Sequence, residues 1–337
     1  MIRTGHTARA GGPPRGVTGA ADVRTLASAA AVAAGLLVAL LLPTVASTYY
    51  IRLVAGIFMF GTLASAWNLI GGYAGYADFG AAAFFGLGAY ATGILMTAAH
   101  APFVVGVAAG CVLAAIAAGL MGSVLLRLRG HYFAVASLGF MLVLQQLAAN
   151  LGVTGGGAGM NLPVARNFTA FYYWLLGILI LAVLAGYALP RSRAGYALAA
   201  IRENQDAAQV LGIEPLPYKI LAYAASAWFF GAAGGVYAYW FTFIDPPTVF
   251  NVDFTIQAVV MTLFGGPGTT LGPIVGAIVL KSLDTILTSV SVFLHNVLFG
   301  GLICLLVVFA PRGLAEIAAA RGSIWRAIRT GLRESRV

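Results

Sequence analysis

The chain has 337 residues, of which 61% are hydrophobic and 9% charged, and its formal net charge is +9. Soluble domains carry about 25% charged residues, and a water-soluble fold of this composition would expose apolar patches large enough to aggregate. The composition therefore excludes an ordinary soluble domain and predicts an integral membrane protein.

The apolar stretches are continuous, which favours helices over a membrane barrel. The run ASAAAVAAGLLVALLLPTVA, residues 27–46, is one example, whereas barrel strands alternate apolar and polar residues. A helix needs about 20 apolar residues to cross the hydrocarbon core, and it satisfies its own backbone hydrogen bonds there. We therefore expect an all-α integral membrane protein, built as a polytopic helical bundle.

The N-terminal residues 1–25 are rich in glycine and proline and contain four arginines. This composition cannot build a packed core, so we expect a disordered basic cytosolic tail. A secretory signal peptide is the alternative, because PTVAS after the first apolar run resembles a cleavage site. The tail is long for the basic region of such a peptide, which favours an uncleaved first span. Residues 26–310 would then form the transmembrane domain, and residues 311–337 a second basic cytosolic tail.

About ten apolar segments follow one another, and their connections alternate in charge. The connections 47–52, 150–169 and 242–253 carry only Arg52 and Arg166, whereas most other basic residues lie in the remaining connections and the tails. The positive-inside rule then predicts that both termini lie in the cytoplasm. The expected spans are 26–46, 53–71, 80–99, 103–126, 131–150, 170–189, 219–241, 254–266 (shorter than a full span), 271–289 and 293–310.

Several spans carry pairs of residues at helical spacing. Lys281 and Asp284 stand at i,i+3, where they can neutralise one another on one helix face. Small residues at i,i+4 let helices approach closely in lipid, and ordinary bundle packing is sufficient to account for them. These pairs are Gly106 and Gly110, Gly231 and Gly235, and Gly272 and Gly276.

Two segments interrupt the helical pattern with glycine and proline: IGGYAGYADFG, residues 70–80, and LFGGPGTTLGP, residues 263–273. Backbone N–H and C=O groups that lose their helical partners in this way must form hydrogen bonds with other protein groups or with water in a cavity. Paired Gly-broken segments in a transporter indicate a translocation path; the alternative is that each is a tight turn between spans. The candidate path residues are Gly72, Tyr73, Gly75, Asp78, Gly265, Gly266 and Gly268.

Asp78 is the only formal charge between Leu53 and Leu126. A charge inside a bundle is costly, so it faces a partner, water or cargo. One interpretation places Asp78 on the path, where it meets a polar or ammonium group of the solute. The other makes Asp78 the cap of the helix that begins near Gly80. We favour the cap, because caps belong just before the start of a helix.

Residues 190–218 form the longest hydrophilic stretch after the N-terminal tail. Apolar residues recur in it near helical spacing, and Gly212 followed by two prolines is a stop signal. We expect one short amphipathic helix between Arg193 and Gly212, on the cytosolic surface. Such a helix lies on lipid headgroups or inserts into the groove of a soluble partner.

This stretch and four others resemble, in the same order, elements of the LivM-type permeases of branched-chain amino acid ABC importers. RAGYALAAIRENQDAAQVLGI, residues 193–213, resembles the family's coupling loop, in which Asp206 stands where the degenerate EAA…G signature has Glu. The other matching elements are GGYAGYADFGAAAFFGLGAY (71–90), LRLRGHYFAVASLGF (126–140), VTGGGAGM (153–160) and VVMTLFGGPGTTLGPIVGAIVL (259–280).

The resemblance extends from about Trp67 to Arg312, and the sequence departs from the family at two positions. Ala81 replaces the usual His, and Asp78 replaces a common Ser. Both changes concern the Gly-rich element, so the exact solute stays open. Branched-chain or other hydrophobic amino acids are the implied solutes, and urea, short amides or aromatic acids are the alternatives, because related permeases serve those solutes.

The resemblance implies a permease subunit of an ATP-driven ABC importer in the bacterial inner membrane. The implied partners are a homologous second permease of LivH type, two ATP-binding cassette subunits, a periplasmic solute-binding protein and the lipid bilayer. The loop 190–218 would couple to the ATPase, with a small Ala207–Ala208 face allowing close docking. The implied coupling residues are Gly195, Arg202, Glu203, Asp206, Ala207, Ala208 and Gly212.

No residue pattern in the sequence indicates chemistry within the chain. Cys111 and Cys304 lie in apolar runs, no histidine has a second ligand at metal spacing, and no GxxxxGK[ST] loop is present. We expect no catalytic, cofactor-binding or metal site, with ATP bound by partner subunits. The rival class is a stand-alone ion-coupled carrier, which would need titratable residues deep in several spans; only Asp78 and the Lys281–Asp284 pair qualify.

Overall fold

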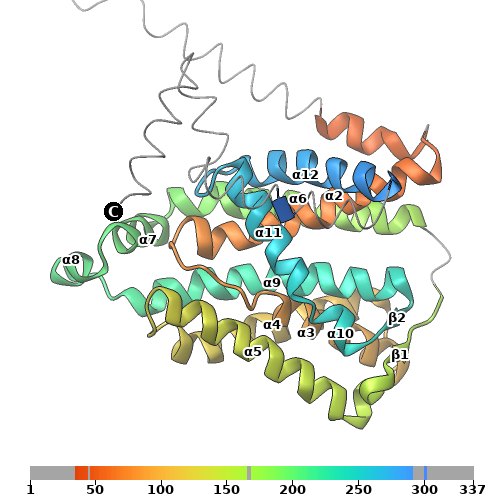
Figure 1. The fold of residues 1–337 in the computed structure, drawn as a ribbon, viewed down its shortest axis with the longest axis horizontal. Helices are drawn as coiled ribbons and strands as arrows, with labels where there is room; N and C mark the ends of the chain where they lie inside the picture. Colours follow the sequence, from red (N-terminus) through yellow and green to blue (C-terminus); the bar gives the residue numbers. More distant parts are fainter. Residues whose placement is uncertain (1–34, 45, 165–167, 291–299, 302–337) are drawn as a thin grey trace, which may run out of the picture. The chain divides into compact units, whose positions relative to one another are not determined.

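The computed structural model describes residues 35–44, 46–164, 168–290 and 300–301, most of them helical (Figure 1). The chain divides into two units, Met1–Ser47 and Thr48–Val337. In the first unit the helix Gly35–Thr44 is described, within the first predicted span. The predicted tails, and all but two residues of the predicted span 293–310, lie outside the described residues.

Long helices joined by short connections make up the described part of the second unit. They are α2 (Thr48–Trp67), α3 (Ala82–Thr97), α4 (Phe103–Leu125), α5 (His131–Asn150), α6 (Phe168–Ala188), α9 (Pro215–Phe241), α11 (Val252–Gly265) and α12 (Gly272–Val290). The shorter elements are η1 (Asn68–Gly72, a π-helical turn), η2 (Gly152–Thr154), η3 (Gly156–Ala158), β1 (Met160–Asn161), η4 (Leu189–Arg191), α7 (Arg193–Glu203), α8 (Gln205–Val210), β2 (Phe243–Ile244) and α10 (Pro246–Val249).

Six helices among the described residues are long and apolar enough to cross a membrane. Two further apolar helices, Gly35–Thr44 and Ala82–Thr97, are shorter than a full span. The structure therefore shows a polytopic helical protein, with fewer full-length spans in the described ranges than the ten expected. The six are Thr48–Gly72, Phe103–Leu125, His131–Asn150, Thr169–Arg191, Pro215–Phe241 and Pro246–Gly265.

The helices α3, α4 and α9 pack together through glycines. A Cβ on Gly231 of α9 would lie 2.9 Å from the carbonyl oxygen of Gly110 of α4, and a Cβ on Gly88 of α3 would lie 2.1 Å from the Gly231 carbonyl oxygen. Such distances require that the backbones touch, which small residues permit in lipid. The predicted packing roles of Gly110 and Gly231 are confirmed.

The helices α11 and α12 approach one another in the same way, beside α2. A Cβ on Gly276 would lie 1.8 Å from the Met261 carbonyl oxygen, and the Thr262 hydroxyl donates to the Ala64 carbonyl of α2 at 2.9 Å. On α12 the predicted ion pair is confirmed, because Lys281 Nζ lies 2.5 Å from Asp284 Oδ2. These contacts hold the second Gly-broken segment, between α11 and α12, close to the end of α2.

The predicted connections gather at two ends of this unit. The strands β1 and β2 pair antiparallel, with Met160 opposite Ile244, and so join the predicted external connections 150–169 and 242–253. In Figure 1 these strands lie at the opposite end of the unit from α7 and α8, which come from the predicted cytosolic stretch. The arrangement agrees with the alternation that the positive charges predict.

Candidate functional site

The two Gly-rich segments, residues 70–80 and residues 263–273, meet at the side chain of Asn68. The Asn68 Nδ2 donates to the Thr269 carbonyl oxygen at 2.8 Å, and its Oδ1 accepts from the Gly268 N–H at 2.8 Å. Asn68 is buried. One carboxamide thus satisfies two backbone groups that the irregular segment leaves without a helical partner.

The close approach explains one of the predicted path glycines. A Cβ on Gly72 would lie 1.8 Å from Asn68 Oδ1 and 2.7 Å from the Gly268 nitrogen, so no larger residue fits without movement. Sequence reasoning missed Asn68 as a functional residue. Its signal was available, because Asn68 is the only carboxamide in the predicted span 53–71.

Both Gly-rich segments also bond to the end of α6. The Tyr73 hydroxyl donates to the Gly186 carbonyl oxygen at 2.8 Å, and the Thr270 hydroxyl donates to the same oxygen at 3.3 Å. Gly265 and Gly266 are buried beside them. The structure therefore brings the two predicted halves of the path together, through side-chain bonds on two sides.

Arg202 of α7 contacts both Gly-rich segments. Its Nη1 donates to the Gly72 carbonyl oxygen. A Cβ on Gly75 would lie 3.1 Å from Arg202 Cγ, and a Cβ on Gly268 would lie 3.0 Å from Arg202 Nη1. Both glycines have positive φ, +75° and +78°, which side chains rarely adopt. A predicted coupling residue therefore contacts predicted path residues at one place, which we call the junction of the α7–α8 helices with the Gly-rich segments.

Asp78 lies in the connection before α3 and is 1% exposed. Its Oδ1 accepts from the Gly80 N–H at 2.9 Å, whereas the cap position of α3 is held by Ala81. No described residue forms a hydrogen bond with Oδ2. Burial raises the pKa of Asp78 to about 6, against the smaller lowering effects of the Gly80 N–H and the Ser137 hydroxyl. The carboxyl is therefore bonded locally, in the turn that precedes the helix, through one oxygen.

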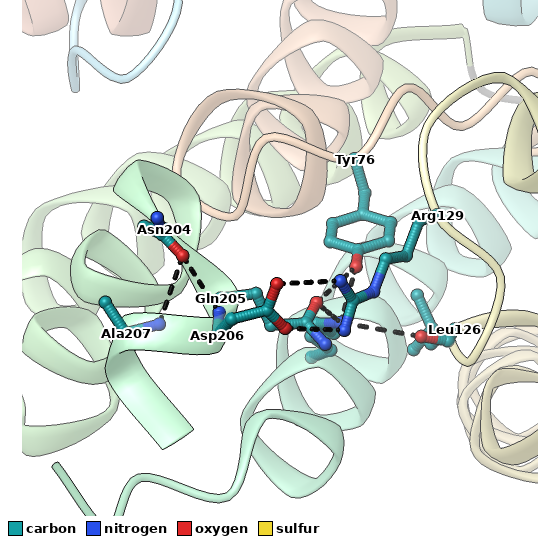
Figure 2. Close-up of polar contacts among 8 residues, drawn as sticks. Tyr76, Leu126, Arg129, Asn204, Gln205, Asp206 and Ala207 are labelled. Atoms are coloured by element: carbon teal, nitrogen blue, oxygen red, sulfur yellow. Dashed lines mark hydrogen bonds and ion pairs between the residues drawn. The ribbon is translucent and has the colours of Figure 1, made fainter. Parts of the chain in front are cut away.

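The predicted cytosolic helix is in fact two helices, α7 and α8, so the expectation of one continuous helix is wrong. Asn204 breaks it with an extended backbone (φ −158°, ψ 109°). Its Oδ1 accepts from the N–H groups of Asp206 and Ala207, each at 3.0 Å (Figure 2). Asn favours caps because its side chain competes for backbone donors, and here it starts α8.

The predicted coupling residues divide between buried and exposed positions. Gly195 is buried where a Cβ would lie 2.1 Å from the Leu189 carbonyl oxygen. Ala208 is 2% exposed, on the side of α8 that faces the protein, so of the predicted Ala207–Ala208 face only Ala207 is exposed. Glu203, Ala207 and Gly212 are exposed.

Asp206 pairs within the chain. Figure 2 shows its carboxylate facing the guanidinium of Arg129, from the connection between α4 and α5. The two bonds measure 2.8 Å and 3.2 Å, and both side chains are exposed. The Arg129 guanidinium lowers the pKa of Asp206 through hydrogen bonding and charge. The pair links α8 to the start of α5.

Lys219 lies beneath this pair and is 2% exposed. Its Nζ donates to the Tyr76 hydroxyl at 2.5 Å, to Gln205 Oε1 at 2.6 Å and to the Leu126 carbonyl oxygen at 3.5 Å. Sequence reasoning missed Lys219, which is the first residue of the predicted span 219–241. Nothing in the local sequence shows its burial, because Tyr76 is 143 residues away.

A pocket of about 560 Å³ opens between these elements. It lies between the first Gly-rich segment, the start of α5 and the α7–α8 helices, and its polar lining includes Arg129, Arg202 and Gln205. Within the described ranges, no group of three or more histidine, cysteine or acidic residues could hold a metal ion. The hydrogen bonds and the ion pair around this pocket join α7, α8, α9 and the first Gly-rich segment to the connection before α5.

The fold and this junction define a class: a polytopic α-helical membrane protein in which Gly-broken segments are tied to short surface helices at one end. A family model described as branched-chain amino acid transport system / permease component matches residues 49–309. The chain belongs to this family.

Similar curated proteins include permease subunits of several transport systems. The high-affinity branched-chain amino acid transport system permease protein LivM of Escherichia coli (strain K12) is 28% identical over 279 residues, which cover 73% of this chain and 65% of that protein. The L-arabinose ABC transporter permease protein AraH of Azospirillum brasilense is 27% identical over 228 residues, 64% of this chain and 66% of AraH. The chain thus spans about two thirds of the length of these relatives. No solved structure matches it.

Proposed function

We propose that the chain is the permease subunit of an ATP-driven ABC importer for branched-chain or other hydrophobic amino acids. The observation that carries the proposal is the family match over residues 49–309, together with the similarity to LivM. In this proposal two ATP-binding cassette subunits bind ATP, a LivH-type permease completes the pathway, and a periplasmic protein delivers the solute. The spans lie in the bacterial inner membrane.

The α8 helix is the proposed docking element for an ATPase subunit. At its end Val210 is 88% exposed and Leu211 80% exposed, and Ala207 is exposed one turn earlier. Apolar side chains at the charged, water-facing end of a membrane protein mark an interaction site more readily than they would on a lipid-facing surface. The Asn204 cap and the Asp206–Arg129 pair fix the orientation of α8 relative to α7 and to the connection before α5.

Co-purification with an ATPase subunit tests the proposal. Ala207→Arg should abolish ATPase association and reduce ATP-dependent uptake in proteoliposomes at least tenfold, because bulk and charge would enter the docked face. The matched control is Val153→Arg, which adds the same charge at an exposed position in η2. Association and uptake that survive Ala207→Arg would show that α8 is not the docking element.

The solute is proposed from the family description and from LivM. The family also contains relatives named for autoinducer 2 and for L-arabinose, so membership alone does not fix the cargo. Direct binding of leucine, isoleucine and valine to the cognate periplasmic protein, compared with urea, acetamide and phenylacetate, decides this point. Tight binding of urea or acetamide alone would overturn the amino-acid assignment and leave the permease assignment intact.

A further inference from the structure

Lys219 is a buried lysine whose hydrogen-bond partners among the described residues are all uncharged. An ammonium group has three N–H donors, and Lys219 directs them to three acceptors, Tyr76 Oη, Gln205 Oε1 and the Leu126 carbonyl oxygen. The carboxylate of the nearby α8 residue Asp206 is paired with Arg129 instead. The donors of the ammonium are therefore fully used, without an ion pair.

The three acceptors belong to three different elements. Tyr76 lies in the first Gly-rich segment, Gln205 is the first residue of α8, and Leu126 is the C-cap residue of α4. The Tyr76 hydroxyl also donates to Gln205 Oε1 at 3.0 Å, which closes a triangle of three side chains. Figure 2 shows the Tyr76 ring and Gln205 beside the Arg129–Asp206 pair.

The triangle is better placed than the outer ion pair to transmit a displacement. The Arg129–Asp206 pair is exposed, and water and salt screen such pairs. Lys219 is enclosed, and the Tyr76 ring that it faces at 4.4 Å packs edge-on against Phe133 of α5 at 5.3 Å. A movement of Gln205 must therefore either carry Tyr76 with it or break the bonds of the buried Lys219 ammonium.

A buried charge is also an expensive way to stabilise a helix end. Replacing buried ionic groups by apolar residues of similar size is often neutral or stabilising. The lysine is therefore a weak source of stability, and its bonds join α8 to the first Gly-rich segment.

We propose that Lys219 is a positioning residue that transmits displacement of α8 to the first Gly-rich segment. This inference rests on the proposed function, because it assumes that an ATPase subunit moves α8. When α8 shifts, the triangle moves Tyr76, and Tyr76 moves the segment that contains Gly72 and Gly75. ATP hydrolysis and solute movement are thereby kept in step.

The test measures the ratio of solute transported to ATP hydrolysed, in proteoliposomes that contain the full importer and its binding protein. Lys219→Met keeps the length and burial of the side chain and removes all three bonds. We expect the ratio to fall about tenfold, equivalent to a coupling loss of about 1.4 kcal/mol. A residue that only supports the fold would lower both rates together and leave their ratio unchanged.

Two milder variants keep the test decisive if Lys219→Met fails to assemble. Tyr76→Phe removes one hydroxyl of the triangle and keeps the ring, and it should lower the same ratio severalfold. Tyr223→Phe is the matched control: it removes a buried hydroxyl one turn further along α9, where no described residue bonds it. Its ratio should equal that of the unmodified protein.

Two failures are distinguishable. If the unmodified chain with its partners shows no ATP-driven uptake, the proposed function itself is wrong. If the unmodified importer transports solute and Tyr76→Phe and every assembled Lys219→Met sample keep its ratio, the positioning role alone is overturned.

Discussion

At the scale of single residues, Asp78 shows what burial does to a carboxyl group in this protein. One oxygen bonds the Gly80 N–H and the other bonds no described residue. Burial raises its pKa from the ordinary value of 3.8 to about 6. The folded protein therefore binds this proton more tightly than the unfolded chain does, and the folded state loses stability as the pH rises through this interval.

Asp78→Asn should remove this pH dependence. In the unmodified protein, ionisation of Asp78 should lower the free energy of unfolding by about 2–3 kcal/mol as the pH rises from 4 to 7. One pKa unit corresponds to about 1.4 kcal/mol. Denaturant unfolding of the detergent-solubilised protein across this range measures the difference. Asp78→Ser, equally uncharged, should give the same flatter profile, and profiles parallel to that of the unmodified protein would contradict the assignment.

The same variant separates the two roles considered for Asp78. A local bond needs only an acceptor, which Asn supplies, whereas an ammonium group of a solute needs the charge. Intact assembly with uptake reduced at least tenfold in Asp78→Asn would favour the path. Intact uptake would leave the carboxyl with its local role alone.

At the scale of elements, the contact between the Gly-rich segments depends on the absence of side chains. Gly72 lies against Asn68 and the backbone of Gly268, and the second of these cannot rotate away. A Cβ on Gly71 would likewise lie 2.3 Å from the Trp67 ring. The turn η1, which follows α2, can therefore meet the second segment only because Gly72 carries no side chain.

Gly72→Ala should destabilise the protein by about 1–3 kcal/mol, as overpacking of a dense contact does. Gly119→Ala is the matched control, because a Cβ there meets nothing within 4 Å and Ala favours a helix more than Gly does. Thermal unfolding of the two variants in detergent measures the difference. Equal melting temperatures would show that the two segments are less tightly packed than we describe.

At the scale of the whole molecule, the connections rich in basic residues gather at one end and the poorly charged ones at the other. Arg129, Arg202 and Lys219 meet in one junction, whereas the pairing of β1 with β2 joins connections with few positive charges. The positive-inside rule therefore predicts that the junction faces the cytoplasm.

Reporter fusions test this orientation. Alkaline phosphatase fused at Gly212 should be inactive, and green fluorescent protein fused at the same point should fluoresce. Fusions at Pro247, in α10, should give the opposite pair of results. Active phosphatase at Gly212 would invert the proposed topology and exclude docking of a cytosolic ATPase on α8.

Much of the helical architecture could be predicted, because apolar runs and glycine spacing are local properties of the sequence. The spacing of Gly110 and Gly231 predicted that they suit close helix packing, but not which helices they contact. The side of α8 that faces the protein did not, since Ala207 and Ala208 are chemically alike and only their packing distinguishes them. The break at Asn204 had a local signal, a favoured cap residue within a helical pattern, which the periodicity of the flanking residues concealed.

The junction was harder to predict because its bonds join distant residues. Asn68 bonds backbone atoms about 200 positions further along the chain, and Lys219 bonds a tyrosine that precedes it by 143. The sequence shows that a lysine stands at one end of an apolar run, where a basic residue typically indicates the cytoplasmic end of a span. It does not show that a tyrosine and a glutamine surround the ammonium.

The Gly186 carbonyl oxygen has a consequence for the order of events during transport. Its two lone pairs serve Tyr73 of one segment and Thr270 of the other. Retreat of the α6 terminus would therefore break its bonds to both Gly-rich segments at once, so we expect the two segments to separate from α6 together.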